Sequence, residues 1–429
     1  MPRVMLILPT ETYRATAFLH AAEELGLQVV VASNEAPTLA ALMEGRVLTL
    51  DLRRPAESAE RAADFASRWP VDAVVGVDEG SVLTAATVAE RLRTPSRNPV
   101  QSVAATRDKR LLRQRLTENG LPQPRFAALD VHAGAADIDS AISVTGLPCV
   151  IKPVDLAASR GVIRADDRTA AGAAVVRVAS LLREICADGS VSPLLVESYV
   201  DGVEVALEGL VHQGVLEVIA IFDKPDPLAG PFFEETIYVT PSRLDDPAQV
   251  AVISAARDAV TALGLQHGPV HAEVRMADSV PIVIEVAARS IGGLCSQIIR
   301  VECDDAPGET RSLENVILRE ACGLELGAMH MVDRACGVFM LPISAAGILR
   351  GIGGANLAES IPGITGVTLS IPVGQPVVPL PEGDRYLGFI FARGDSPEPV
   401  ESALREAQAL LDVDIREMPP GGIEPPSTG

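Results

Sequence analysis

Lysine is scarce in this 429-residue sequence: Lys109, Lys152 and Lys224 are the only three among 36 basic residues. Lysine carries a compact point charge, whereas arginine carries a wide planar fork. The scarcity therefore has two explanations. Either codon bias has left three lysines by chance, or lysine is kept only where arginine will not serve.

Positive charge, long apolar runs and paired cysteines are also lacking. The formal net charge is −21. Because phosphate binding needs an excess of Lys and Arg, we expect no nucleic-acid partner and no anionic membrane partner. The apolar run at residues 4–8 is too short for a signal-peptide core or a membrane helix. The six cysteines include no CxxC pair and are expected to be reduced and mostly buried. These features predict a cytoplasmic protein.

Two common nucleotide-binding motifs are missing. The loop after the first expected strand, residues 9–14, holds no GxGxxG, and no GK dipeptide occurs anywhere in the sequence. The sequence therefore supports neither a dinucleotide fingerprint in that loop nor a P-loop. The glycine cluster Gly351–Gly354 follows no first strand, and we interpret it as a turn.

The apolar pattern predicts an α/β protein. Apolar residues make up 48% of the chain, which is enough for sizeable cores. Strands and helices alternate in the first hundred residues, which predicts a parallel sheet with helices on both faces. The expected strands there are 4–8, 29–32 and 73–77, and the expected helices are 15–25, 57–68 and 82–92.

A linker of Pro, Ser, Arg and Asn at residues 94–99 precedes a helix at 108–119, which Gly120 ends. Further strands are expected at 147–152, 194–198, 203–211, 215–222, 270–276 and 282–287, and further helices at 169–186, 247–263 and 397–411. From about Arg334 the chain is rich in Gly, Pro and Val, which indicates short strands. The tail 419–429 has the composition of a disordered segment.

The segments HAEVRM and PIVIEVAAR predict a hairpin with one apolar face and one acidic face. A turn centred on Ser279 places Glu273 opposite Glu285. The strand period of two then puts Ala272, Val274, Met276, Ile282, Ile284 and Val286 on one face, and His271, Glu273, Arg275, Val283, Glu285, Ala287 and Arg289 on the other.

Two glutamates that face each other repel. A bound Mg²⁺ or Mn²⁺ would resolve the repulsion, since hard cations prefer oxygen ligands. Neutralisation of a solvated face by Arg275 or Arg289 is the alternative.

Charged residues also stand at the ends of other expected strands. Lys152 ends an apolar strand and is followed by a turn, Ser159–Val162, whose backbone N–H groups would be free to bind anionic oxygens. Glu197 and Glu204 stand at the ends of two later strands, where a carboxylate accepts hydrogen bonds from an adenine amino group or ribose hydroxyls. Each of these features alone is common in proteins.

In this order, the motifs resemble the ATP-grasp family. They run from Asp108-Lys109 through GLPCVIKP, the Ser159–Val162 turn, ESYVDGVE and Glu273 to EVAARSIGG, across roughly residues 70–300. The resemblance implies an N-terminal Rossmann-like pre-domain at 1–100, an ATP-grasp domain at 101–330 with a lid at roughly 122–200, and a C-terminal α+β domain at 331–418. It also settles the lysine question in favour of retained charges for Lys109 and Lys152.

The resemblance also implies roles for individual residues. Lys109, Lys152 and the loop Ser159, Arg160 and Gly161 would bind the ATP phosphates. Glu197, Tyr199 and Val200 would hold adenine, and Glu204 would hold the ribose. Glu273 and Glu285 would bind Mg²⁺, or Mn²⁺. Arg289 would bind the γ-phosphate, or the carboxylate and its acyl phosphate.

One position departs from the family pattern. The family often has Asn two residues after the second metal-binding Glu, where this chain has Ala287. Either water completes the metal shell or metal binding is weaker, and we favour water. The sequence EVAAR looks closer to the L-amino acid ligases, the dipeptide-forming branch.

The implied activity is an ADP-forming carboxylate–amine ligase that acts on small molecules and joins amino acids through an acyl phosphate. Glu79, Lys224, Glu235, His271, Arg289 and Gly293 are the candidate substrate-binding residues, and Arg14 is a weaker one. Purine-pathway and carboxylase-type enzymes of the family are the nearest alternative, although no extra basic cluster for a phosphorylated substrate is evident. A nucleotide-binding protein without turnover is the other. The sequence offers a homodimer only as the commonest assembly.

Overall fold

The computed structural model describes residues 1–429 apart from 37–42, 44, 187–191, 333 and 418–429. The chain forms two compact units, each assembled from several segments. Unit 1 comprises Met1–Phe126, Val200–Asp223 and Thr240–Asp333, and unit 2 comprises Ala127–Tyr199, Lys224–Val239 and Arg334–Gly429. The division into three domains stays a prediction, and the expected tail at 419–429 lies outside the described residues.

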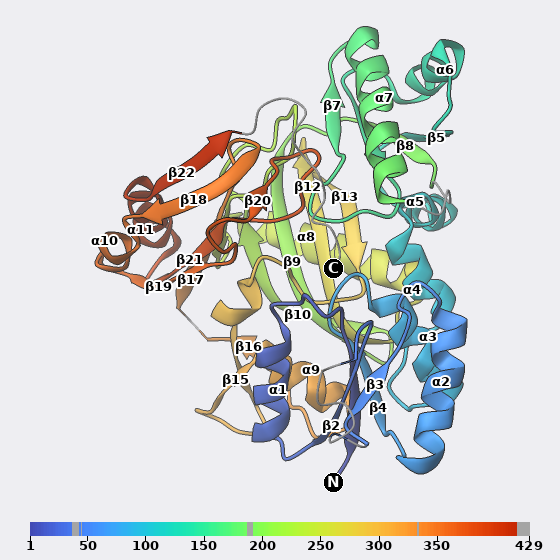
Figure 1. Ribbon diagram of the computed structural model, residues 1–429, viewed down its shortest axis with the longest axis vertical. Coiled ribbons are helices and arrows are strands. Elements are labelled where there is room, and N and C mark those ends of the chain that lie inside the picture. The colour runs from blue at the N-terminus through green and yellow to red at the C-terminus, as the bar shows by residue number, and fades with distance from the viewer. Residues whose placement is uncertain (37–42, 44, 187–191, 333, 418–429) are drawn as a thin grey trace. The chain divides into compact units, whose positions relative to one another are not determined.

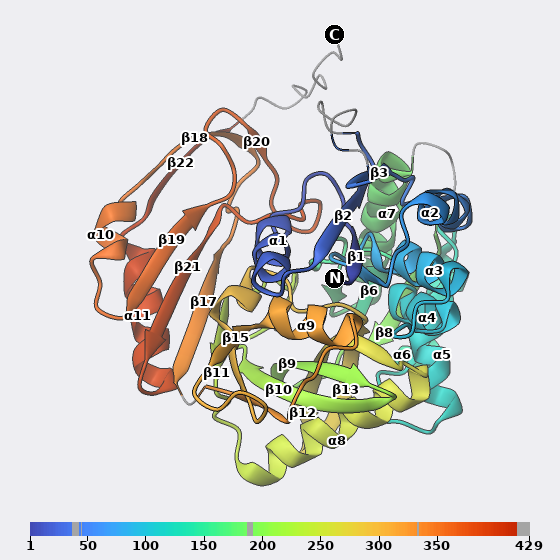
Figure 2. The same cartoon turned by 90° about the horizontal axis from the view of Figure 1, so that it is seen from below.

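Unit 1 opens with the predicted parallel sheet, whose strand order is β3-β2-β1-β4. Its strands are β1 (Arg3–Ile7), β2 (Gln28–Ser33), β3 (Val47–Thr49) and β4 (Ala73–Gly76). Residues Val4 to Ile7 of β1 are fully buried, as expected of a central strand covered on both faces. Figures 1 and 2 show α1 (Ala15–Glu24) on one side of this sheet and α2 (Pro55–Arg68) and α3 (Val82–Leu92) on the other.

A second sheet of unit 1 carries the acidic hairpin. Its antiparallel strands run in the order β13-β12-β9-β10. Their bounds are β9 (Val203–His212), β10 (Val215–Asp223), β12 (His267–Ala277) and β13 (Val280–Ala287). Helix α8 (Asp246–Leu263) lies across these strands (Figure 2), and its buried residues share one core with α4 (Val100–Arg107) and α5 (Lys109–Glu118).

The remaining elements of unit 1 follow the hairpin. They are the 3₁₀ helix η2 (Cys295–Ile298), β14 (Arg300–Cys303), β15 (Thr310–Ser312), α9 (Leu313–Ala321) and β16 (Met329–Met331). Neither α4 nor α9 is among the predicted helices. The spacing of Leu313, Val316 and Ile317 fits a buried helical stripe, and all three are at most 1% exposed.

Unit 2 has two separate cores. One is formed by the sheet β5-β8-β6-β7 and the helices α6 and α7. The bounds of these elements are β5 (Phe126–Leu129), α6 (Ala135–Thr145), β6 (Cys149–Pro153), β7 (Ile163–Ala165), α7 (Arg168–Ile185) and β8 (Leu194–Ser198). The other lies among the strands β11-β17-β21-β19, the sheet β20-β18-β22 and two helices, with bounds β11 (Ile237–Thr240), β17 (Ala335–Leu341), β18 (Gly347–Gly353), α10 (Ala355–Glu359), β19 (Ile364–Leu369), β20 (Pro376–Val377), β21 (Gly388–Gly394), α11 (Pro397–Ala409) and β22 (Asp412–Glu417).

The interpretation of Gly351–Gly354 as a turn is wrong. Residues Gly351 to Gly353 belong to β18 and pair with residues Asp414 to Asp412 of β22. Gly354 has φ +82° and precedes α10. A Cβ at Gly354 would collide with the carbonyl oxygen of Leu410, so close backbone approach explains this glycine.

The predicted pairing of Glu273 with Glu285 is confirmed, but for a different reason. The turn holds only two residues, Asp278 and Ser279, both with positive φ. This turn alone would put Glu273 opposite Ile284. A β-bulge then shifts the register between Glu273 and Val274 and leaves Ile284 as the extra residue.

The bulge also corrects the predicted faces. Val283 is expected beside the glutamates, yet it lies opposite Val274 and is 1% exposed within the core. Ile284 is expected in the core and is only partly buried. Strict alternation fails here because the extra residue reverses the side-chain order along β13.

Arg113 on α5 holds the bulge. Its side chain is fully buried and donates hydrogen bonds to the carbonyl oxygens of Val283, at 3.1 Å, and Ile284, at 2.7 Å. These are the two carbonyls beside the register shift. The guanidinium therefore satisfies backbone groups that the irregular pairing displaces.

Arg113→Met should destabilise the fold by roughly 2–4 kcal/mol, because two buried carbonyls would lose charge-assisted partners. Urea unfolding measures the effect. Arg115→Met is the matched control, since Arg115 lies on the same helix with a side chain that is 44% exposed. Equal midpoints for the two variants would contradict this role of Arg113.

Candidate functional site

The acidic face of the hairpin is flanked by a lysine and a histidine. The Nζ atom of Lys109 lies 3.4 Å from Oε2 of Glu285, and Nε2 of His271 lies 3.7 Å from Oε1 of Glu273. Lys109 is buried and is the first residue of α5, where Asp108 caps the helix by accepting from the N–H groups of Arg110 and Leu111. Helix capping thus fixes where the lysine enters this site.

A buried carboxylate lies behind the histidine. Glu208 on β9 is fully buried, its Oε2 accepts a hydrogen bond from the N–H of Ile291 at 2.9 Å, and Nδ1 of His271 is 3.6 Å away. Burial raises the pKa of Glu208. Burial alone would lower the pKa of His271, but Glu208 and Glu273 outweigh it and the pKa is raised. The structure therefore favours a bound proton among Glu208, His271 and Glu273.

Arg289 and Arg107 clamp one carboxylate. Arg289 Nε donates to Oε2 of Glu79 at 2.5 Å, and Arg107 donates to Oε1 at 2.6 Å. Burial alone would raise the pKa of Glu79, but the two arginines hold it at about 2. The pKa of Arg289 is raised because Glu79 and Glu285 outweigh the effect of burial. Two predicted substrate residues, Glu79 and Arg289, are thus brought together.

The weaker candidates of unit 1 lie near Ser290. Buried Arg14 donates to the carbonyl of Val77, at 3.1 Å, and to the carbonyl and hydroxyl of Ser290. Gly293 has φ +60°, which a side chain would strain. Arg14 therefore supports the backbone beside Arg289.

Glu204, the predicted ribose ligand, is paired with Arg275. The two residues are direct neighbours across β9 and β12, and Arg275 Nε lies 2.6 Å from Glu204 Oε2. The same guanidinium donates to the carbonyl of Val200 at 2.6 Å. Arg275 therefore neutralises Glu204.

In unit 2, Lys152 and Glu197 form a buried ion pair. Lys152 on β6 is opposite Leu195 on β8, so Glu197 is its diagonal neighbour on the same face of the sheet. The Nζ to Oε2 distance is 2.6 Å, and the side chains are 6% and 4% exposed. Lys152, which is predicted to bind phosphate, and Glu197, which is predicted to bind adenine, are thus paired with each other.

Tyr199 lies next to this pair along the chain and is packed by two neighbours. The guanidinium of Arg164 is 4.2 Å from its ring centroid, and the ring of Phe233 stacks at 6.4 Å. An aromatic ring with a cation over its face has little freedom to turn.

The sequence predicts that the Ser159–Val162 turn leaves its N–H groups free for anionic oxygens, but those of Arg160, Gly161 and Val162 donate to protein carbonyls. The N–H groups of Arg160 and Val162 bond to carbonyls within the loop, and that of Gly161 donates to the carbonyl of Pro381 at 2.8 Å. The Arg160 side chain donates to the carbonyl of Glu382 and to Asp384. Sequence reasoning missed these partners because they are more than 200 residues away.

Lys224 and Glu235 also lie together in unit 2. Lys224 Nζ donates to Oε1 of Glu235 at 2.6 Å, and the hydroxyl of Tyr238 donates to the same oxygen at 2.7 Å. The ammonium also lies 5.1 Å from the ring centroid of Tyr238. These two predicted substrate residues form one compact ionic group.

Three domain models match the chain: ATP-grasp N-terminal domain at residues 19–96, ATP-grasp domain at 145–298 and L-amino acid ligase C-terminal domain 2 at 339–416. The chain belongs to the ATP-grasp superfamily. Its similarity to the L-amino acid ligase branch, expected from EVAAR, is confirmed by the C-terminal match, and use of ATP follows from this membership.

Similarity to individual proteins supports the same family membership. This ATP-grasp protein is 30% identical to alanine–anticapsin ligase of Bacillus subtilis (strain 168) over 56% of this chain and 53% of that protein. It thus spans about half the length of that relative. The crystal structure of an L-amino acid ligase from Bacillus licheniformis has a TM-score of 0.82 at 27% identity and covers 97% of this chain and 99% of that one.

More distant ATP-grasp structures share the fold alone. An N5-carboxyaminoimidazole ribonucleotide synthetase from Thermotoga maritima has a TM-score of 0.68 at 15% identity, covering 97% of this chain and 100% of that one. No helix among the described residues is long and apolar enough to cross a membrane.

Sequence reasoning missed two charged residues of this ATP-grasp protein. Glu208 is the single charged residue in the apolar run Val205 to Leu210. A carboxylate in such a run is expected to be buried and to have a specific partner. Arg107 directly precedes the Asp108-Lys109 motif and clamps Glu79. Its partner is 28 residues away, so no local pattern reveals the contact.

Glu79→Gln tests the clamp through pH dependence. The folded-state pKa of about 2 lies below the ordinary 4.5. The ionised group therefore contributes stability above pH 4.5 that is lost as the pH falls toward 2. The shift corresponds to roughly 3 kcal/mol at about 1.4 kcal/mol per unit.

We expect urea unfolding free energies of the wild type and Glu79→Gln to differ at neutral pH and to converge in acid. Glu60→Gln is the control, because Glu60 also pairs with an arginine, at 2.8 Å, but on the exposed surface. Parallel pH profiles for the wild type and Glu79→Gln would refute the clamp.

Proposed function

We propose that this chain is an ATP-dependent carboxylate–amine ligase that forms an amide between amino acids through an acyl phosphate. The observation that carries the proposal is the match to an L-amino acid ligase over 97% of the chain, with a C-terminal domain of the same branch. The acidic hairpin beside Lys109 and the Lys152–Glu197 pair supply the charges that such chemistry needs.

The reaction has two steps. A substrate carboxylate oxygen attacks the γ-phosphorus of ATP and ADP leaves; an amine nitrogen then attacks the acyl carbon, phosphate leaves and the amine loses a proton. Phosphoryl transfer depends on positioning and charge neutralisation more than on acid–base residues. We assign phosphate binding to Lys109, Lys152 and the Ser159–Gly161 loop, where a phosphate would replace the carbonyl partners of the Arg160 and Gly161 N–H groups. We assign acyl-phosphate binding to Arg289.

The nucleoside contacts follow the family order. We assign adenine to Glu197, Tyr199 and Val200, and the ribose to Glu204. Glu204 accepts from Arg275 through Oε2, so a ribose hydroxyl would share this carboxylate with the guanidinium or displace it.

Mg²⁺ fits the opposed carboxylates of Glu273 and Glu285. When bound there, it neutralises phosphate charge. The position where the family often has Asn is Ala287, which is 1% exposed and paired with His271. Its methyl group offers no ligand atom, so Glu273 and Glu285 would hold the ion and water would take the place of the Asn.

Substrate recognition is assigned to Glu79, Arg289, His271 and Gly293 in unit 1 and to Lys224 and Glu235 in unit 2. Glu235 already accepts two hydrogen bonds, which fits an oxygen acceptor for a substrate ammonium. His271 lies between Glu208, 3.6 Å from its Nδ1, and Glu273, 3.7 Å from its Nε2, which places it beside the proposed metal and substrate groups.

A cytoplasmic location agrees with the need for ATP. A homodimer is supported only by the general frequency of such assemblies, and light scattering would compare the mass with the 45.0 kDa chain. The carboxylase-type alternative shares the fold at 15% identity, and a protein without turnover would keep the same ion pairs. Product analysis separates all three.

Incubation with ATP, Mg²⁺ and pooled amino acids should yield ADP, phosphate and new amide masses. Lys152→Ala should lower the rate of phosphate release by about 100- to 1,000-fold, the usual effect of losing one preorganised electrostatic contact. Lys152→Arg should also fail, because a planar fork does not replace a point charge. Release of AMP and pyrophosphate would overturn the acyl-phosphate mechanism.

Glu285→Gln should raise the Mg²⁺ concentration needed for half-maximal rate, because it replaces a charged oxygen ligand by an amide. Initial rates over a Mg²⁺ titration measure the change. Glu302→Gln serves as a control on β14, outside the hairpin. An unchanged titration curve for Glu285→Gln would remove the metal assignment.

A further inference from the structure

Two of the six histidines face each other at the ends of paired strands. His212 ends β9, His267 begins β12, and the two are direct partners in the antiparallel register. Opposed residues project from the same face of a sheet. The ring centroids are 5.6 Å apart with the planes at 85°.

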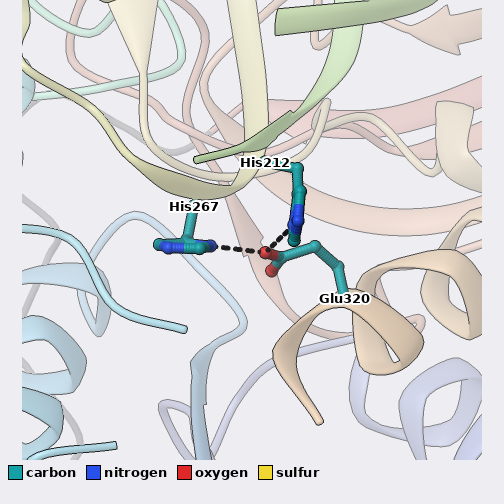
Figure 3. Close-up of side chains that lie close together, drawn as sticks. All are labelled: His212, His267 and Glu320. Atoms are coloured by element: carbon teal, nitrogen blue, oxygen red, sulfur yellow. Dashed lines mark hydrogen bonds and ion pairs between the residues drawn. The ribbon is translucent and has the colours of Figure 1, made fainter. Parts of the chain in front are cut away.

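A buried carboxylate from another element completes the group. Glu320 on α9 is 2% exposed, and its Oε1 lies 3.2 Å from Nδ1 of His212 and 2.7 Å from Nδ1 of His267. Figure 3 shows both imidazoles directed at this one oxygen. Ligand atoms of all three residues lie within 4.8 Å of one another.

The backbone around this group is tied down. The Asn98 side chain accepts from the N–H groups of Gln266 and His267, at 2.7 and 3.0 Å, and donates to the carbonyl of His267 at 2.7 Å. The hydroxyl of Ser96 donates to the carbonyl of Glu320 at 3.0 Å. Residues from one loop therefore hold both the strand end and the helix end, which preorganises the three side chains.

The electrostatics of the site favour a cation. The ion-pair partners of buried Glu320 are two imidazoles, whose charge depends on protonation, unlike that of lysine or arginine. Burial of a carboxylate without a fixed counter-charge is costly. Glu320 also lies in the last turn of α9, where the helix dipole favours positive rather than negative charge. A divalent ion would offset both effects.

We propose that His212, His267 and Glu320 form a binding site for a divalent transition metal ion, with Zn²⁺ the best match. Two imidazoles and one carboxylate are typical zinc ligands, whereas Mg²⁺ prefers oxygen alone. The site lies outside the proposed ligase machinery and does not depend on the proposed function.

Two of the ligand-atom separations are already close to those of a tetrahedral zinc site. Bonds of about 2.0–2.1 Å place tetrahedral ligand atoms about 3.3 Å apart. The His212 separation of 3.2 Å already matches, and His267 has to move by roughly half an ångström. A cavity of about 70 Å³, lined in part by Asn98, His267 and Glu320, adjoins the group, and this is room enough for a water as the fourth ligand.

The bound ion would join β9, β12 and α9 through side chains. Because the metal binds the folded chain, it should raise the melting temperature in a concentration-dependent way. His212 is 62% exposed, so its replacement removes a ligand with little disturbance of packing.

The test is a Zn²⁺ titration of EDTA-treated full-length protein, by calorimetry, in a large excess of Mg²⁺ to occupy oxygen-rich sites. The wild type should bind one Zn²⁺ ion. His212→Ala should bind it at least about 100-fold more weakly, because even the loss of a residue that supports a metal ligand lowers metal affinity about 10- to 100-fold. Glu320→Gln should show a similar loss. Melting temperatures with and without Zn²⁺ should follow the same order.

His20→Ala is the matched control, because His20 is also a surface histidine, 3.3 Å from Glu24, but it belongs to no group of three metal-ligating side chains among the described residues. It should bind Zn²⁺ like the wild type. Thiols cannot mimic the result, because all variants keep the same six cysteines. Amide-forming activity, measured without Zn²⁺, should be equal in the wild type and His212→Ala.

Two results would overturn the site. One is a wild type that takes up no Zn²⁺, or takes it up as weakly as His212→Ala. The other is full retention of affinity in Glu320→Gln, which would exclude the carboxylate as a ligand.

Discussion

The opposed carboxylates of Glu273 and Glu285 are the constraint around which unit 1 is organised. Like charges directly across two strands repel, so the surrounding structure has to supply compensation. Lys109 reaches one carboxylate and His271 the other. The bulge at Ile284 puts the two glutamates face to face, and buried Arg113 supports that bulge. A regular hairpin with the same turn would offset the glutamates by one residue.

Most charges assigned to ligands already have partners inside the protein. Lys152 pairs with Glu197, Lys224 with Glu235, Arg289 with Glu79 and Glu204 with Arg275. Buried charges need such pairing to be tolerated at all. A ligand that engages one of these groups therefore exchanges one charged partner for another, and its affinity reflects the difference between the two.

Much of the fold was predictable because it rests on local patterns. Helix α3 has the predicted bounds 82–92, and the strands that carry Lys152, Glu197, Glu273 and Glu285 lie within a few residues of expectation. The Ile284 bulge was not predictable, because Arg113, which supports it, lies on a helix about 170 residues earlier in the chain. The same holds for the Gly161 contact with Pro381 and for the strand at Gly351–Gly353, whose partners lie far along the chain. The order of the motifs predicted which charged residues belong to the candidate site. It did not predict which of them pair with one another, because those pairs are tertiary contacts.

The interleaving of the two units has a consequence for synthesis on the ribosome. Unit 1 needs residues as far as 333, and unit 2 needs strands beyond 334 although it begins at Ala127. Arg14 reaches partners 276 positions later at Ser290. Contacts of such sequence separation form slowly, so the early segment cannot pack against residues 240–333 until most of the polypeptide has emerged. During that interval the apolar surface of the early segment stays accessible, and exposed apolar surface is what makes partly folded chains prone to aggregation.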